Sequence, residues 1–202
     1  MPQALPYLRE TPSQTAGPYV HIGLAPGAAG FDIYREELGH RIIALDTPGE
    51  RIRIEGCVFD GTGAPVRDVL IELWQADGQG IHPHPEDPRH ADCAPGFRGW
   101  ARIVPDFDTG LFVIDTIRPG SVPGPNGRPQ APHLSLWLVA RGINTGLQTR
   151  MYFDNLDNAA DPLLALIEQP DRRDTLIARC EGAIYRFDIH LQGNRETVFI
   201  DV

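Results

Sequence analysis

The chain has 202 residues, of which 42% are hydrophobic, and a formal net charge of -9 at pH 7. The length suits one globular domain over residues 1–202, and the negative charge argues against partners that need clustered Lys and Arg, such as nucleic acid or anionic membranes. With no signal peptide, no membrane-length apolar run and three widely spaced cysteines, Cys57, Cys93 and Cys180, we expect a soluble, cytoplasmic protein without a disulfide framework.

Short segments with strand character recur between turn signals. In residues 51–59, Ile52, Ile54 and Val58 fall on one face of a two-residue period, and a glycine-rich turn follows. Near the end of the chain, residues 183–191 alternate cleanly between apolar and polar side chains, which predicts a half-buried strand. Other predicted strands are 67–75, 99–104, 111–117, 133–140, 147–153 and 196–202, the last as the hairpin partner of 183–191.

Helices are expected only over residues 34–45 and 162–180, the second with a break at Pro170. About eight strands without long intervening helices predict an all-β fold, a β-sandwich of two mainly antiparallel sheets. The first 30 residues are polar, turn-rich and non-periodic, so we interpret them as an extended arm that lies on another surface.

Two groups of side chains are candidates for chemistry. His82, His84 and His90 share a proline-rich loop, but none of the common zinc spacings is present, and solvated histidines are the commoner outcome. His133 begins a strand in which Ser135 is its face-mate, and a serine hydroxyl is a poor ligand for iron or zinc.

Arg141 follows the same strand. Its guanidinium could bind an organic carboxylate, and a surface ion pair is the alternative.

Six segments stand out along the chain: 10–19 (ETPSQTAGPY), 73–77 (LWQAD), 116–120 (TIRPG), 131–133 (APH), 150–154 (RMYFD) and 185–189 (YRFDI). Together they resemble the alpha-type chains of the intradiol ring-cleaving dioxygenase family, in family order across nearly the whole chain. The resemblance implies homologous alpha and beta β-sandwiches of which only beta holds Fe(3+), through two tyrosines and two histidines.

The four ligand positions of that family are degenerate here. They are occupied by His82, Val122, His133 and Ser135, so both phenolates are missing and only His133 is kept. Phenolates are the anionic hard donors that suit ferric iron. We therefore expect no metal site and no catalytic residue in this chain.

The resemblance implies a role beside a beta subunit. It implies cleavage of protocatechuate (3,4-dihydroxybenzoate) with O2 to 3-carboxy-cis,cis-muconate at the beta subunit's iron, within the beta-ketoadipate pathway, by a multimer of alpha-beta pairs. It places the arm, residues 1–30, at the subunit interface, and Arg141 with four arm residues at the substrate pocket. The four are Thr15, Gly17, Pro18 and Tyr19.

Three alternatives stay open. The chain could be an enzyme that uses His82, His84, His90 and His133 as an unusual metal set. It could be a stand-alone β-sandwich binding module that works without a beta partner. It could also be a purely scaffolding subunit that contributes interface area and no pocket residue.

Overall fold

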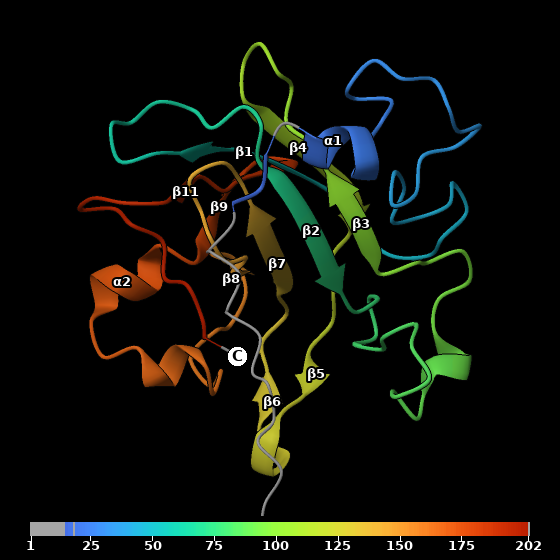
Figure 1. Cartoon of the computed structure of the whole chain (residues 1–202). Helices are drawn as coiled ribbons and strands as arrows, with labels where there is room; N and C mark the ends of the chain where they lie inside the picture. Colours follow the sequence, from blue (N-terminus) through green and yellow to red (C-terminus); the bar gives the residue numbers. More distant parts are fainter. Residues whose placement is uncertain (1–14, 18, 202) are drawn as a thin grey trace, which may run out of the picture.

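The computed structural model describes residues 15–17 and 19–201. Strands dominate it and its helices are short, so the predicted all-β class is confirmed (Figure 1). The elements are α1 (Tyr19–Leu24), β1 (Arg51–Phe59), β2 (Leu70–Gln75), η1 (His90–Asp92), β3 (Trp100–Ile103), β4 (Leu111–Ile117), β5 (Val122–Pro123), η2 (Pro125–Gly127), β6 (Pro129–Gln130), β7 (Leu134–Val139), β8 (Leu147–Phe153), η3 (Leu164–Leu166), α2 (Pro170–Asp174), β9 (Ile177–Glu181), β10 (Ile184–Arg186) and β11 (Ile189–His190).

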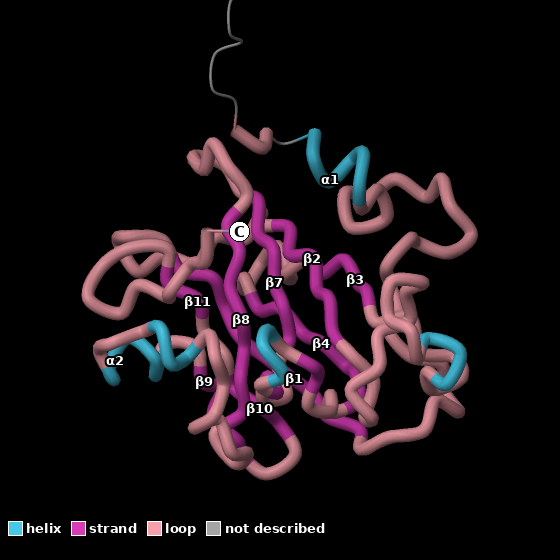
Figure 2. The backbone as a smooth tube through the Cα atoms, turned by 90° about the horizontal axis from the view of Figure 1, so that it is seen from below, coloured by secondary structure: helices cyan, strands magenta, loops and turns pink. Residues whose placement is uncertain are grey.

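The strands fold around one core. Neighbours follow one another in the order β4, β1, β10, β9, β8, β7, β2, β3, and β11 pairs with β1 beyond the end of β10. Most pairs are antiparallel, but β1 runs parallel to β10 and β11, and β8 runs parallel to β9. The β1–β4 side and the β2–β7 side bury their inner residues in one cluster, with β9 as the link between the two layers (Figures 1 and 2).

Alternation along the strands selects the inner face. In β1, Ile52, Ile54 and Val58 are buried as the sequence predicts, and Leu134 and Leu138 of β7 face them across the core. Burying an aliphatic side chain of this size contributes about 1.5–3 kcal/mol. The outer face of β7 thereby carries Ser135, Trp137 and Val139, and part of the candidate site lies there.

The predicted helix over residues 34–45 is wrong. The segment runs along the edge of β3, where the backbone N–H groups of Arg98 and Arg102 donate to the carbonyls of Ile42 and Gly39 at 2.8 and 3.0 Å. Gly39 has a φ of 78°, and a Cβ there would lie 2.8 Å from the Arg102 nitrogen. An edge strand leaves its N–H groups unpaired, and this segment supplies their acceptors.

The predicted helix over residues 162–180 is confirmed only in its first part. η3 and α2 are short, and α2 begins at Pro170, where the sequence predicts the break. From Ile177 on, the prediction is wrong because Ile177–Glu181 is β9, paired with β8 on one side and β10 on the other. Strand pairing with two neighbours overrides the local helical pattern.

The predicted strand over residues 183–191 is interrupted between β10 and β11. Its alternation is nevertheless correct, since Tyr185, Phe187 and Ile189 are all buried. At the interruption, the Asp188 carboxylate accepts the backbone N–H of Cys57 at 3.0 Å in place of a ladder bond.

The predicted hairpin partner, residues 196–202, is wrong. Residues 196–201 form no strand in the part of the chain that the structure describes. The Thr197 N–H donates to the His190 carbonyl at 2.9 Å, and the Thr197 hydroxyl accepts the His190 N–H at 3.0 Å. The chain then crosses to β8, where the Ile200 N–H donates to the Gln148 carbonyl at 2.8 Å.

The amino-terminal segment is not extended throughout. Residues 1–14 and Pro18 lie outside the described residues, so the arm prediction is untested over them. Tyr19–Leu24 forms α1, and its buried His21 contacts Phe107 edge-on with ring centroids 5.4 Å apart. In the described ranges, no helix has the length and apolar character needed to cross a membrane.

Candidate functional site

Arg141 follows β7 in a turn that Thr15 holds from outside the sheet. The Thr15 hydroxyl donates to the Ala140 carbonyl at 3.1 Å and accepts the Gly142 N–H at 2.8 Å. Gly142 has a φ of 83°, a left-handed conformation that favours glycine. One arm residue therefore fixes the backbone on both sides of Arg141.

Arg141 also makes an ion pair. Its Nε lies 2.5 Å from Oδ2 of Asp68, and 66% of the Arg141 side-chain surface is exposed. Leu70 pairs with Val139 at the end of the β2–β7 ladder, so Asp68 and Arg141 are opposite each other when the register is extended by two residues. The surface ion pair considered as an alternative for Arg141 is present, and the side chain is still accessible.

The other predicted arm residues are less closely connected to Arg141. The Gly17 carbonyl accepts the Val20 N–H at 3.1 Å, which places Gly17 at the start of α1. Tyr19 is 78% exposed. Pro18 lies outside the described residues. The structure thus joins Thr15 to the Arg141 turn by hydrogen bonds, and it leaves Tyr19 facing away from the body of the chain.

A separate hollow of about 470 Å³ brings together two of the degenerate positions, His82 and Val122. The His82 ring stacks on Trp74 with centroids 5.6 Å apart and an interplanar angle of 9°. Burial, as the largest cause, lowers the pKa of His82 below its usual value, which favours the neutral imidazole. Gln130 from β6 also lines the hollow.

His133 is buried beside this hollow. Its Nδ1 lies 2.7 Å from the Ala131 carbonyl, so Nδ1 carries the proton, and its ring packs on Tyr152 at 5.7 Å. Burial first, and the positive charge of Arg150 second, lower the pKa of His133 to about 4. His133 is therefore a neutral, hydrogen-bonded histidine at the start of β7.

The side chains at the four degenerate positions do not fit a ferric ion. Val122 offers no donor atom and Ser135 offers only a neutral hydroxyl, while ferric iron needs anionic oxygen ligands. Ser135 lies between Trp74 and Arg150 in the strand register, and neither of these directly opposite residues is acidic. Across residues 15–17 and 19–201, His, Cys, Asp and Glu side chains form no group of three or more that could hold a metal ion.

Two buried carboxylates that sequence reasoning missed shape this region. Asp77 accepts the N–H groups of Gln79, Ile81 and Ala94 at 2.8–2.9 Å, which fixes the loop carrying His82. The motif ending in Asp77 contained this signal, because an Asp at a strand end often caps a turn.

Asp161 is the second buried carboxylate, and it fixes the backbone that leads into β7. It accepts the Ala131 N–H at 2.9 Å, the Tyr152 hydroxyl at 3.1 Å and the Leu163 N–H at 2.9 Å. Because Asp161 is distant in sequence from Ala131 and Tyr152, no local sequence pattern reveals this role.

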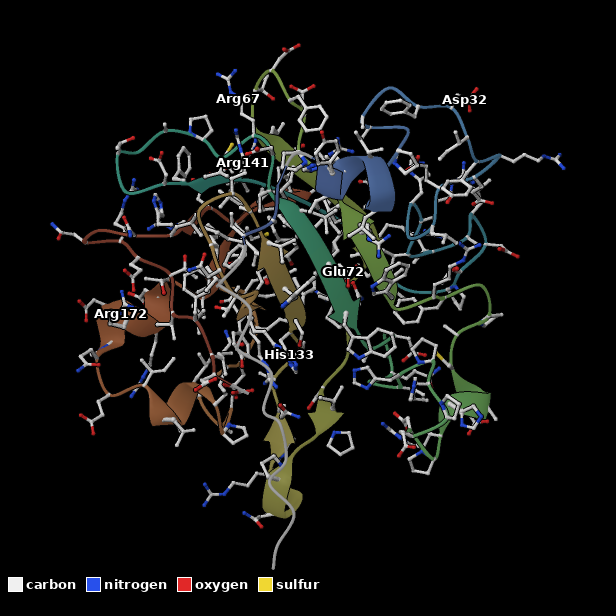
Figure 3. All side chains as sticks on the ribbon, in the orientation of Figure 1. Asp32, Arg67, Glu72, His133, Arg141 and Arg172 are labelled. Atoms are coloured by element: carbon white, nitrogen blue, oxygen red, sulfur yellow. The ribbon has the colours of Figure 1, made fainter. Side chains whose placement is uncertain are left out.

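The two regions lie at opposite ends of β7 (Figure 3). His133 precedes the strand and Arg141 follows it, so they are roughly 25 Å apart at about 3.3 Å per residue. Arg141 therefore cannot reach the hollow of its own chain, and its exposed guanidinium faces outward at the other end of the sheet.

The architecture matches solved intradiol dioxygenases. One from Tetranychus urticae is 17% identical, with a TM-score of 0.59 over 81% of this chain and 93% of its own. A catechol 1,2-dioxygenase from Pseudomonas arvilla is 22% identical, with a TM-score of 0.55 over 76% of this chain and 55% of its own. At these identities the likeness defines the fold alone: the chain shares the all-β fold of these dioxygenases.

Sequence comparison is more specific. The family model described as Dioxygenase matches residues 36–193. The alpha chain of protocatechuate 3,4-dioxygenase from Pseudomonas putida is 50% identical over 96% of this chain and 97% of its own. The beta chain of the Burkholderia cepacia enzyme is 40% identical over 74% of this chain and 67% of its own. The chain belongs to the intradiol ring-cleavage dioxygenase family, and its relatives include protocatechuate 3,4-dioxygenase alpha chains.

Proposed function

We propose that the chain is the alpha, non-iron-binding subunit of a protocatechuate 3,4-dioxygenase. It works with a beta-type partner in a multimer of alpha-beta pairs, and the partner holds Fe(3+). The assembled enzyme cleaves protocatechuate with O2 to 3-carboxy-cis,cis-muconate. A cytoplasmic location is part of this proposal, in keeping with free thiols at Cys57, Cys93 and Cys180.

One observation carries the proposal. Arg141 is held rigidly by Thr15, is largely exposed, and lies at the end of the sheet away from the hollow at His82 and Val122. The ion pair with Asp68 engages only Nε of this arginine, and two thirds of its side-chain surface stays exposed. Such an arginine suits a pocket that a second chain completes.

The chemistry assigned to Arg141 is recognition of the substrate carboxylate. A guanidinium binds a carboxylate through two parallel N–H···O bonds, and such charge-assisted bonds are stronger than neutral ones. The family resemblance assigns Thr15, Gly17 and Tyr19 to the border of the same pocket, where they would exclude water; Pro18, which shares that assignment, lies outside the described residues. The partner's ferric ion supplies the activation of the catechol ring toward dioxygen.

Residues 19–45, which comprise the second part of the arm and the segment that follows it, expose apolar side chains of the kind found at subunit interfaces. In the described part of the chain, eight of the ten exposed large hydrophobic side chains lie between Tyr19 and Leu45. Leu45 is 98% exposed and Leu38 is 71% exposed. Apolar side chains concentrated in this way mark protein–protein contacts. They support placing the arm and α1 against the partner.

Co-expression tests the proposal. The chain is produced alone and together with a beta-type chain, and iron content and protocatechuate-dependent oxygen uptake are measured for each. The proposal expects both only in the complex. Stoichiometric iron or turnover in the lone chain would refute it in favour of a metal enzyme built on His82, His84, His90 and His133. Failure of the two chains to associate would favour a stand-alone module.

A further inference from the structure

From the ion pair at the end of the β2–β7 ladder, we propose that Asp68 is a positioning residue that aims the Arg141 guanidinium at the substrate carboxylate. This inference rests on the proposed function and adds a residue to it. Asp68 does not contact the substrate in this arrangement and acts only through Arg141.

The contact geometry favours positioning. Asp68 Oδ2 meets Arg141 at Nε, the nitrogen nearest the side-chain stem, at 2.5 Å. Contact at Nε leaves the two terminal nitrogens, which form the end-on fork that binds a carboxylate. Because the Asp68 side chain is only 28% exposed, it is less mobile than the arginine that it holds.

The backbone on both sides restricts the pair further. Thr15 fixes the Arg141 turn through Ala140 and Gly142. The buried Val69 and Leu70 hold Asp68 at the start of β2, where the ladder with β7 begins. Both partners are therefore attached to the same end of the β2–β7 ladder, and side-chain entropy is the main freedom left to Arg141. Restricting that freedom before substrate arrives lowers the cost of binding.

Competition is the alternative role. Asp68 carries the same charge as the substrate carboxylate and could simply draw the guanidinium away from it. The two roles predict opposite changes in KM when Asp68 is replaced. Loss of a positioning Asp68 raises KM for protocatechuate, whereas loss of a competing Asp68 lowers it.

The test uses the assembled alpha-beta enzyme with Asp68→Asn, Arg141→Ala and the double variant. KM is measured for protocatechuate and for catechol, which lacks the carboxylate. Dissociation constants of 4-hydroxybenzoate, which carries the carboxylate but is not cleaved, are measured by calorimetry. Asp115→Asn is the matched control, because Asp115 is an exposed strand carboxylate paired with Arg53 at 3.1 Å.

We expect Asp68→Asn to raise KM for protocatechuate and the dissociation constant of 4-hydroxybenzoate about fivefold, the scale of one exposed ion pair. KM for catechol stays unchanged, and Asp68→Asn has no further effect once Arg141 is alanine. Asp68→Glu, which keeps the charge but moves the carboxylate, weakens binding as well and replaces Asp68→Asn if that variant does not fold.

Two results would overturn the inference. A lower KM in Asp68→Asn means competition, and equal changes for protocatechuate and catechol mean a general structural role. If Arg141→Ala weakens protocatechuate binding while both Asp68 variants do not, the positioning role of Asp68 is refuted and the substrate role of Arg141 stands. If Arg141→Ala changes nothing, both roles are refuted.

Discussion

Replacement of Thr15 by valine should release the arm from the Arg141 turn. The change is nearly isosteric and removes only the hydroxyl, which makes hydrogen bonds of 3.1 Å to Ala140 and 2.8 Å to Gly142. Each bond contributes about 1 kcal/mol net, so the attachment weakens by about 2 kcal/mol. At about 1.4 kcal/mol per factor of ten, the detached state becomes roughly 30-fold more populated.

Hydrogen exchange at the Gly142 amide reports this directly, since that amide donates to Thr15. We expect exchange in peptides covering the turn to accelerate by up to the same roughly 30-fold factor in Thr15→Val. Thr15→Ser keeps the hydroxyl and should exchange like the unaltered chain. In the assembled enzyme, KM for protocatechuate should rise in Thr15→Val and not in Thr15→Ser. Equal Gly142 exchange in both variants would refute the idea that this hydroxyl anchors the arm.

Three further predictions concern the scaffold. Asp77→Ala leaves three N–H donors, two of them in buried hydrogen bonds, without their acceptor and should lower the free energy of unfolding by about 3–5 kcal/mol in urea titration, with Asp77→Asn intermediate; a loss below 1 kcal/mol would contradict the assigned role. His133 has a folded pKa of about 4 against an ordinary value of 6.5, so protonation favours unfolding and its stabilisation is lost as pH falls from 6.5 towards 4. Between pH 7 and pH 5 the loss is about 2 kcal/mol, and His133→Asn should lack this part of the pH dependence; parallel stability curves would argue against a buried neutral histidine. Gly56→Ala would place a Cβ 1.8 Å from the Phe187 carbonyl oxygen and should cost several kcal/mol of thermal stability, whereas Gly23→Ala, with no heavy atom within 4 Å, should be neutral or stabilising.

Period-two alternation made the strands predictable. Ile52, Ile54 and Val58 are spaced for one face of a strand, and burial on that face follows from geometry alone. The same rule gave the correct inner face for residues 183–191 although the strand is interrupted there. The helix predictions were wrong where contacts with neighbouring strands determine the secondary structure. Residues 34–45 cover the edge of β3, and Ile177–Glu181 lies between β8 and β10, facts that no local pattern contains.

In the candidate site, too, some features were predictable from the sequence and others depended on the fold. The prediction of no ferric site rests on residue types at four positions that the family resemblance supplies, because Val122 and Ser135 cannot supply anionic oxygen whatever the fold. The position of Arg141 relative to the hollow could not be inferred, since it depends on the direction and length of β7. Asp161 shows the limit most clearly. Its bond to the Ala131 N–H connects residues far apart in the chain.

The sequence by itself determined the strand-rich class and the membership of the family, because each depends on residue identity and short-range spacing. The tertiary structure decided which distant residues meet. Thr15 clamps the Arg141 turn and Asp68 pairs with Arg141, although Thr15 lies 125 residues from Ala140 in the chain. Such contacts follow from the strand register and from closure of the sandwich, and their energies depend on distances that only the folded chain defines.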